Sequence, residues 1–217
     1  MTASSRFALP APGGGTLQGL VDLPDLPGER PTVVLCHGVP GLLEWGFFPP
    51  LADLLAARGF VAVRAERGDL PAVLAALAPG HQDGSGIAPG RVDRTRIGLY
   101  GHGEGAGDAL LAAASSPGPR VRALVTWSTT WSTVLSIPLA AAAARRTTPW
   151  LLVHGEADAT VPVETARRLA AAAAPPAELL VVPDAGHTFG ARHPFAGPTP
   201  QLIQALNATQ RWFRRHV

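Results

Sequence analysis

The chain has 217 residues, 47% of them hydrophobic, and a formal net charge of +2 at pH 7. A chain of this size can bury a sizeable core, so we expect a single domain over residues 1–217. All 18 basic residues are arginine, which excludes a lysine Schiff base, and they are scattered along the sequence. Nucleic acid and anionic membranes require a clustered basic face, so we expect neither as a partner; the oligomeric state stays open.

Cysteine usage and the N-terminal composition indicate a compartment. Cys36 lies in an apolar run and is the single cysteine of the chain, so no disulfide can form within it, which is typical of a reducing compartment. The first 15 residues lack a basic start followed by an apolar stretch, and no apolar run reaches the length of a membrane span. We therefore expect a cytoplasmic protein.

Short apolar runs alternate with longer stretches rich in alanine and leucine. This alternation is typical of strands joined by crossover helices, and it predicts a mostly parallel sheet with helices on both faces. The expected elements, in chain order, are an opening antiparallel pair around Leu17–Leu23, a strand at Thr32–Cys36, a helix at Pro50–Arg58, a strand at Phe60–Ala65, a helix at Asp69–Leu77, a strand at Arg96–Tyr100, a helix at Glu104–Ala114, strands at Val121–Trp127 and Trp150–Val153, a helix at Val163–Ala173, a strand at Glu178–Val182 and a helix at Pro200–Arg214.

Residues 128–146 interrupt this alternation. For them we expect a loop and an alanine-rich helix lying over the edge of the sheet, as a small cap.

The first informative turn follows the strand at Thr32–Cys36, where the chain reads His37-Gly38-Val39. A buried strand that ends in such a turn leaves backbone N–H groups at the carboxyl edge of the sheet, where they suit an oxyanion hole. We assign this role to the N–H of Val39. A simple turn from strand to loop is the alternative reading.

Residues 99–105 read Leu-Tyr-Gly-His-Gly-Glu-Gly. They have the layout of a nucleophile elbow, Gly-x-Ser-x-Gly, with Gly103 in the position of the serine. The N–H of the residue after the nucleophile usually completes the oxyanion hole, which indicates Glu104 here. Glycine-rich turns between strand and helix also bind phosphates, so this pattern alone leaves a second reading open.

Two further strand ends carry an acid and a base. Asp158 follows the strand at Trp150–Val153 on a short loop, and His187 follows the strand at Glu178–Val182. Taken singly, these residues suit an ordinary turn and an ordinary surface position. The order elbow, acid, histidine is nevertheless the order of catalytic groups in the α/β-hydrolase architecture.

These segments together resemble α/β-hydrolases, nearest to the small dienelactone-hydrolase-like and acyl-esterase members, over nearly the whole chain. The resemblance implies a three-layer α/β fold without metal or cofactor, and a small-molecule ester, lactone or carboxylate as ligand. It also implies that Asp158 orients His187, that His187 shuttles a proton, and that Gly103 stands where a serine or cysteine nucleophile belongs.

Glycine has no atom that can attack a substrate, so other sources of a nucleophile have to be weighed. A water beside His187 is one, with Asp158 and His187 acting as a general base. Less favoured replacements are Glu104, whose acidic side chain suits a helix start in any case, the buried Cys36, and the hydroxyl side chains of a loop that follows a strand. These hydroxyl residues are Ser128, Thr129, Thr130 and Ser132.

Two other site types fit less well. Four histidines come near strand ends, but no tight His-x-x-x-His pair supports a metal site. They are His37, His102, His154 and His187. A nucleotide site at Gly98–Gly107 fails because no Gly-Lys-Ser/Thr follows.

The sequence leaves two classes of function. One is an ester, lactone or acyl hydrolase, which has weak activity, uses water as the nucleophile, or is an inactivated form in which the original serine was replaced by glycine. The other is a pseudohydrolase that binds a ligand or partner. Aromatic residues beside the expected site suggest a pocket for an apolar acyl or aromatic group, unless they pack the helices. The expected pocket residues are His37, Trp45, Trp127 and Trp131.

Overall fold

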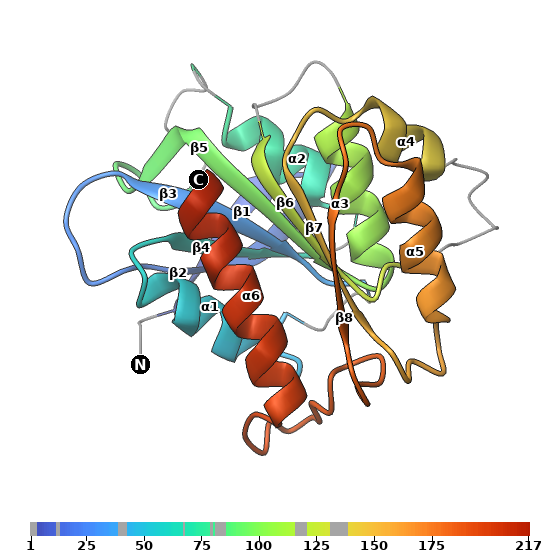
Figure 1. Ribbon diagram of the computed structural model, residues 1–217. Coiled ribbons are helices and arrows are strands. Elements are labelled where there is room, and N and C mark those ends of the chain that lie inside the picture. The colour runs from blue at the N-terminus through green and yellow to red at the C-terminus, as the bar shows by residue number, and fades with distance from the viewer. Residues whose placement is uncertain are drawn as a thin grey trace.

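One mixed sheet forms the centre of the structure (Figure 1). The computed structural model describes residues 4–11, 14–38, 43–66, 68–78, 80, 86–115, 121–130 and 139–217. In this part of the chain the sheet has eight strands in the order β1-β2-β4-β3-β5-β6-β7-β8. Strands β3 to β8 run parallel to one another, whereas β1 pairs antiparallel with β2, and β2 pairs antiparallel with β4. The predicted mostly parallel sheet is confirmed.

The strand positions follow the predicted apolar runs closely. Their bounds are β1 Ser4–Pro10, β2 Thr16–Asp22, β3 Arg30–Cys36, β4 Val61–Ala65, β5 Val92–His102, β6 Val121–Trp127, β7 Trp150–Gly155 and β8 Glu178–Val182. The opening antiparallel pair is confirmed, with β2 at the predicted position and β1 before it. The bounds of β1 were not predicted, because this strand alternates exposed and buried residues at the edge of the sheet and carries no continuous apolar run.

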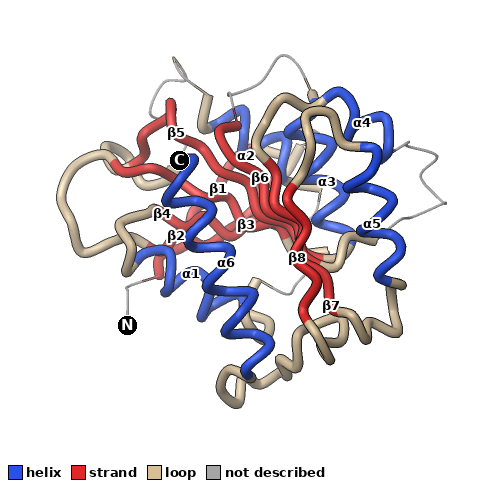
Figure 2. Tube along the Cα trace, viewed as in Figure 1, coloured by secondary structure: helices blue, strands red, loops and turns tan. Residues whose placement is uncertain are grey.

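Six helices in the described part of the chain cover both faces of the sheet (Figure 2). They are α1 Phe48–Ala56, α2 Leu70–Ala76, α3 Glu104–Ala114, α4 Leu139–Arg145, α5 Val163–Ala172 and α6 Pro200–His216. Helices α1 and α6 pack against one face, and α2, α3, α4 and α5 against the other. No helix of the described residues has the length and apolar content needed to cross a membrane.

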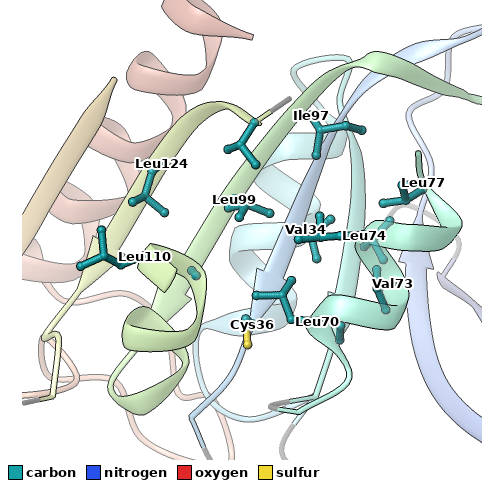
Figure 3. Packing of buried hydrophobic residues seen from close by; sticks show 14 of the residues in the cluster. Val34, Cys36, Leu70, Val73, Leu74, Leu77, Ile97, Leu99, Leu110 and Leu124 are labelled. Carbon is teal, nitrogen blue, oxygen red and sulfur yellow. The ribbon is translucent and has the colours of Figure 1, made fainter. Parts of the chain in front are cut away.

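Alternation along the central strands separates the two cores. Val34 and Cys36 of β3 face α2 and α3, in the cluster of Figure 3, whereas Val33 and Leu35 belong to the cluster under α1 and α6. Since successive side chains of a strand point to opposite faces, a strand buried on both sides reads as the continuous apolar run seen in the sequence.

The expected cap over residues 128–146 needs a correction in its helical part. Helix α4 packs between α3 and α5, and its residues Leu139, Ala142 and Ala143 join the core on that face of the sheet. Helix α4 therefore connects β6 to β7 and belongs to the helical layer on that face of the sheet. Residues 131–138, which precede it, lie outside the described residues, so a cap there stays a prediction.

The topology brings several loops to one edge of the sheet. Because β3, β5, β6, β7 and β8 run parallel, their carboxyl ends lie at the same edge, as in other open α/β sheets where ligands bind there. The segments that the sequence singled out follow β3, β5, β7 and β8 at this edge.

Candidate active site

The turn between β5 and α3 has a sharp backbone geometry. Gly103 has φ +61° and ψ −123°. A Cβ on Gly101 would lie 2.3 Å from the carbonyl oxygen of Gly105, and a Cβ on Gly105 would lie 2.6 Å from the carbonyl oxygen of Cys36. Both flanking positions therefore require glycine. A Cβ on Gly101 would clash with the first turn of α3, and a Cβ on Gly105 would clash with the end of β3.

The space above Gly103 is lined by two polar atoms. A Cβ on Gly103 would lie 3.7 Å from His187 Nε2 and 3.8 Å from Thr130 Oγ1, the two nearest atoms among the described residues. A hydroxyl oxygen attached to that Cβ would come within about 3 Å of His187 Nε2, which is hydrogen-bond distance. The geometry of the turn thus suits a side-chain nucleophile, and glycine supplies none.

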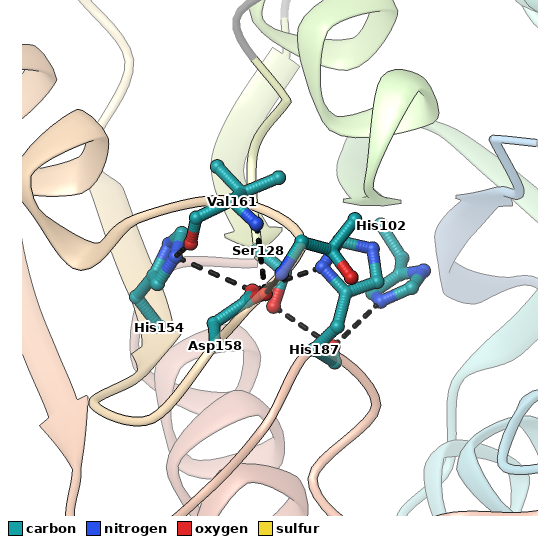
Figure 4. A network of polar contacts seen from close by, with 7 residues as sticks. His102, Ser128, His154, Asp158, Val161 and His187 are labelled. Atoms are coloured by element: carbon teal, nitrogen blue, oxygen red, sulfur yellow. Dashed lines mark hydrogen bonds and ion pairs between the residues drawn. The ribbon is translucent and has the colours of Figure 1, made fainter.

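Asp158 holds the other nitrogen of the histidine ring (Figure 4). His187 Nδ1 donates to Asp158 Oδ2 at 2.9 Å, while the backbone N–H groups of Thr160 and Val161 each donate to Oδ1 at 2.9 Å. Burial alone would raise the pKa of Asp158. The hydrogen bonds from His187, Val161 and Thr160 outweigh burial and hold the pKa of this carboxyl below its usual value, so it stays ionised. With Nδ1 donating, His187 presents Nε2 toward Gly103.

His154 is a neighbour of this pair that sequence reasoning did not assign to it. Its Nε2 donates to the carbonyl oxygen of Val161 at 2.9 Å and lies 3.4 Å from Asp158 Oδ2. Burial lowers the pKa of His154, so the ring is neutral and acts as a hydrogen-bond donor beside Asp158. The spacing of four residues between His154 and Asp158 was the sequence feature that could have predicted their proximity.

Two side chains from other strand ends fix the loop of His187. The carbonyl oxygen of His187 accepts hydrogen bonds from Ser128 Oγ at 2.9 Å and from His102 Nε2 at 3.1 Å (Figure 4). His102 directly precedes Gly103 in the elbow, so the base and the turn are joined through this bond. Sequence reasoning missed this role for both residues, because a backbone carbonyl as acceptor leaves no sequence signal.

Comparison with known proteins concerns the family and the fold of this chain. A family model described as TAP-like protein matches residues 120–195, which include Asp158 and His187. No curated protein matches the chain. Among solved structures, Est1E from Butyrivibrio proteoclasticus has a TM-score of 0.76 at 17% identity, covering 97% of this chain and 98% of that one.

Two further solved structures share the same backbone arrangement. The esterase domain of a Rhodothermus marinus protein has a TM-score of 0.76 at 18% identity, with 99% of each chain covered. An alpha-beta serine hydrolase homologue from Coxiella burnetii has a TM-score of 0.71 at 23% identity, with 97% of each chain covered. The chain has the α/β-hydrolase fold.

Within this α/β-hydrolase fold, one half of the predicted oxyanion hole lies in the described residues. A Cβ on Gly38 would lie 2.9 Å from the backbone nitrogen of Glu104, so the turn after β3 and the start of α3 are in direct contact. The N–H of Glu104 lies at the N-terminus of α3, where the helix dipole favours negative charge. Val39, the other expected donor, lies outside the described residues.

The expected pocket residues differ in their positions. His37 is buried and packs on Phe48, with ring centroids 4.6 Å apart, while Trp45 is half-buried beside it. Trp127 is corrected to a core residue, because its side chain is fully buried and its Nε1 donates to Thr209 Oγ1 of α6 at 2.9 Å. Trp131 lies outside the described residues. Trp45 is therefore the aromatic side chain of the predicted set that the structure leaves accessible.

Several histidines lie at this edge of the sheet. Among the described residues, no group of three or more His, Cys, Asp or Glu side chains has the arrangement that would hold an ion. His102 and His187 have ring centroids 4.9 Å apart, but His102 donates to a carbonyl and His187 donates to Asp158. The rings of His102 and His187 are thus both engaged in hydrogen bonds within this site.

The buried His102 makes stability dependent on pH. Burial and the neighbouring His187 and His37 lower the pKa of His102 from 6.5 to about 3. Between these values the unfolded chain binds a proton at His102 and the folded chain does not, so lowering the pH favours unfolding. We expect this residue to remove about 2 kcal/mol of stability between pH 7 and pH 5.

Urea unfolding at the two pH values measures this effect. In His102→Asn the amide can still donate to the carbonyl of His187 but cannot titrate, so the loss of stability should shrink by about 2 kcal/mol. An equal loss in both proteins would show that His102 is protonated in the folded state at pH 5.

Proposed function

We propose that this protein is an ester hydrolase of the α/β-hydrolase superfamily in which a water molecule takes the place of the serine nucleophile. One observation carries the proposal: His187 binds Asp158 through Nδ1 and directs Nε2 to the space above Gly103. A protein that only binds ligands has no chemical need for this pair.

The reaction follows from general-base catalysis. His187 Nε2 accepts a proton from the water, whose oxygen attacks the ester carbonyl carbon, and the negative charge of Asp158 stabilises the imidazolium that forms. The N–H of Glu104 donates to the oxyanion. The leaving alkoxide then takes the proton from Nε2, so the products are one carboxylic acid and one alcohol.

The size of the expected rate effects limits the class of substrate. Removal of the serine from a comparable triad costs roughly 10⁶-fold in turnover, whereas a general base contributes about 10²–10⁴-fold. Such a site suits activated esters and lactones and is too slow for amides. The solved structures of similar fold include an esterase domain and Est1E, and this likeness supports carboxylic esters as the class, with Trp45 beside the apolar part of the substrate.

Replacement of the base tests the proposal. We expect His187→Ala to lower the hydrolysis of nitrophenyl acetate at least about 100-fold, and Asp158→Asn to lower it by about 10-fold or more, with no initial burst of product in the parent protein. His216→Ala, at the far end of α6, is the matched control and should keep the parent rate. A burst of product, or an unchanged rate in His187→Ala, would refute the water mechanism.

A binding function is the second candidate, and Gly103 itself favours it. The side chain of a nucleophile is missing there, while the N–H of Glu104 is a backbone group that this change leaves in place. The site would then bind a carboxylate or carbonyl ligand without chemistry. Titration of short-chain carboxylates and boronates, followed by tryptophan fluorescence, separates the candidates: binding of both with similar affinity and without hydrolysis of any ester would favour the binding function.

A further inference from the structure

Strand β6 ends in a turn that leads the chain across the elbow. Ser128 follows the strand with φ +46°, a left-handed conformation that a residue other than glycine adopts at a cost. Its N–H donates to the carbonyl of Val153 and its Oγ donates to the carbonyl of His187. These bonds hold the strained turn in place, and the next residues pass over Gly103.

Backbone hydrogen bonds fix Thr130 relative to Gly103. The N–H of Gly103 donates to the carbonyl of Trp127 at 3.0 Å, and the N–H of Thr130 donates to the carbonyl of Gly103 at 3.1 Å. Two backbone hydrogen bonds therefore fix the segment after β6 relative to the elbow. The position of the Thr130 side chain over Gly103 is a consequence of this pairing.

The Thr130 hydroxyl and the His187 ring face the same small space. Thr130 Oγ1 and His187 Nε2 lie 3.8 and 3.7 Å from the point where a Cβ of residue 103 would be. A hydroxyl can accept one hydrogen bond and donate another, whereas a histidine ring that donates to Asp158 through Nδ1 can accept at Nε2. A water in this space would have two acceptors, one for each of its hydrogens.

We infer that Thr130 and His187 together bind and orient the reactive water of this site. The inference rests on the proposed hydrolase function and names the group that aims the water. One O–H of the water donates to Nε2 and is the proton that His187 removes; the other O–H donates to Thr130 Oγ1. Both lone pairs of the water oxygen then point away from the two acceptors, and one of them attacks the carbonyl carbon of the ester.

The bond changes balance with these two partners alone. The new C–O bond forms from the water oxygen, the C=O π pair moves to the carbonyl oxygen, and the water proton passes to Nε2. When the intermediate collapses, the ester C–O bond breaks and the alkoxide takes that proton. Thr130 keeps its own proton throughout, so its role is to orient the water.

Two substitutions at Thr130 distinguish the orientation of the water by the hydroxyl from an effect of the side-chain shape. Thr130→Val keeps the shape of the side chain and removes the hydroxyl, so kcat for nitrophenyl acetate should fall about 10-fold at unchanged KM. Thr130→Ser keeps the hydroxyl and should stay within about twofold of the parent. In Gly103→Ser the serine side chain occupies the space, so adding Thr130→Val should have a much smaller effect there.

A crystal structure of the parent protein at high resolution provides a readout independent of activity. We expect an ordered water within about 3.2 Å of both His187 Nε2 and Thr130 Oγ1, and its loss in Thr130→Val. If this water is present but hydrolysis does not depend on His187, the proposed function fails and the water site stands. If no water bridges these atoms, or if Thr130→Val keeps the parent kcat, the inference about Thr130 is overturned.

Discussion

Gly103→Ser is expected to raise kcat/KM for short-chain nitrophenyl esters by about 10³-fold, because covalent catalysis replaces slow attack by water. The acceptor of the serine proton is already in place, since His187 Nε2 lies 3.7 Å from the Cβ position and its Nδ1 is bound to Asp158. The variant should also show an initial burst of product and react with a fluorophosphonate probe.

Gly103→Ala is the matched control for this variant. Alanine adds the same Cβ at φ +61° and carries the same backbone strain, on the order of 1–3 kcal/mol, but has no hydroxyl. Both variants should therefore lose similar stability, and only the serine variant should gain activity. A serine variant that stays inert and unlabelled would show that residue 103 does not occupy the nucleophile position.

Gly155→Ala is expected to destabilise the protein by about 3 kcal/mol or more, because overpacking here involves backbone atoms that cannot rotate away. A Cβ on Gly155 would lie 2.3 Å from the carbonyl oxygen of Ala185 and 2.6 Å from that of Gly186. The end of β7 and the segment before His187 would have to separate. The distance between Asp158 and His187 would then increase, so hydrolysis should fall along with stability.

Gly186→Ala controls for the loss of a glycine in the same contact. A Cβ on Gly186 would meet no atom within 4 Å among the described residues, so this variant should keep the parent stability within about 1 kcal/mol. Urea unfolding of the two variants at pH 7.5 measures the difference. Equal stabilities would mean that the close approach of β7 to the His187 segment is not a constraint on the fold.

Periodicity and composition predicted most of the fold. Strands β6 and β8 and helix α3 begin and end at the predicted residues, because each is a run of apolar residues bounded by a clear change in pattern. Strand β5 begins at Val92, four residues before the predicted start at Arg96, since its first half carries polar residues that face solvent. Such a half-exposed strand segment pairs through its backbone, so the hydropathy of its residues does not predict it.

The order of motifs predicted which residues meet at the site. Asp158 and His187 each follow a parallel strand, and the carboxyl ends of parallel strands share one edge, so their proximity follows from the topology. The glycines at 101 and 105 were likewise readable, because a turn of this sharpness excludes a Cβ at both positions.

The sequence by itself therefore determined the mostly parallel sheet with helices on both faces and the meeting of Asp158 with His187, since strand period and parallel topology act along the chain. Only the tertiary structure decided that Trp127 packs in the core, that Ser128 and His102 hold the carbonyl of His187, and that Thr130 faces Gly103. These contacts depend on the left-handed turn at Ser128 and on loops that cross between strands. A side chain's type fixes what it can bind, but the path of the backbone decides which partner it reaches.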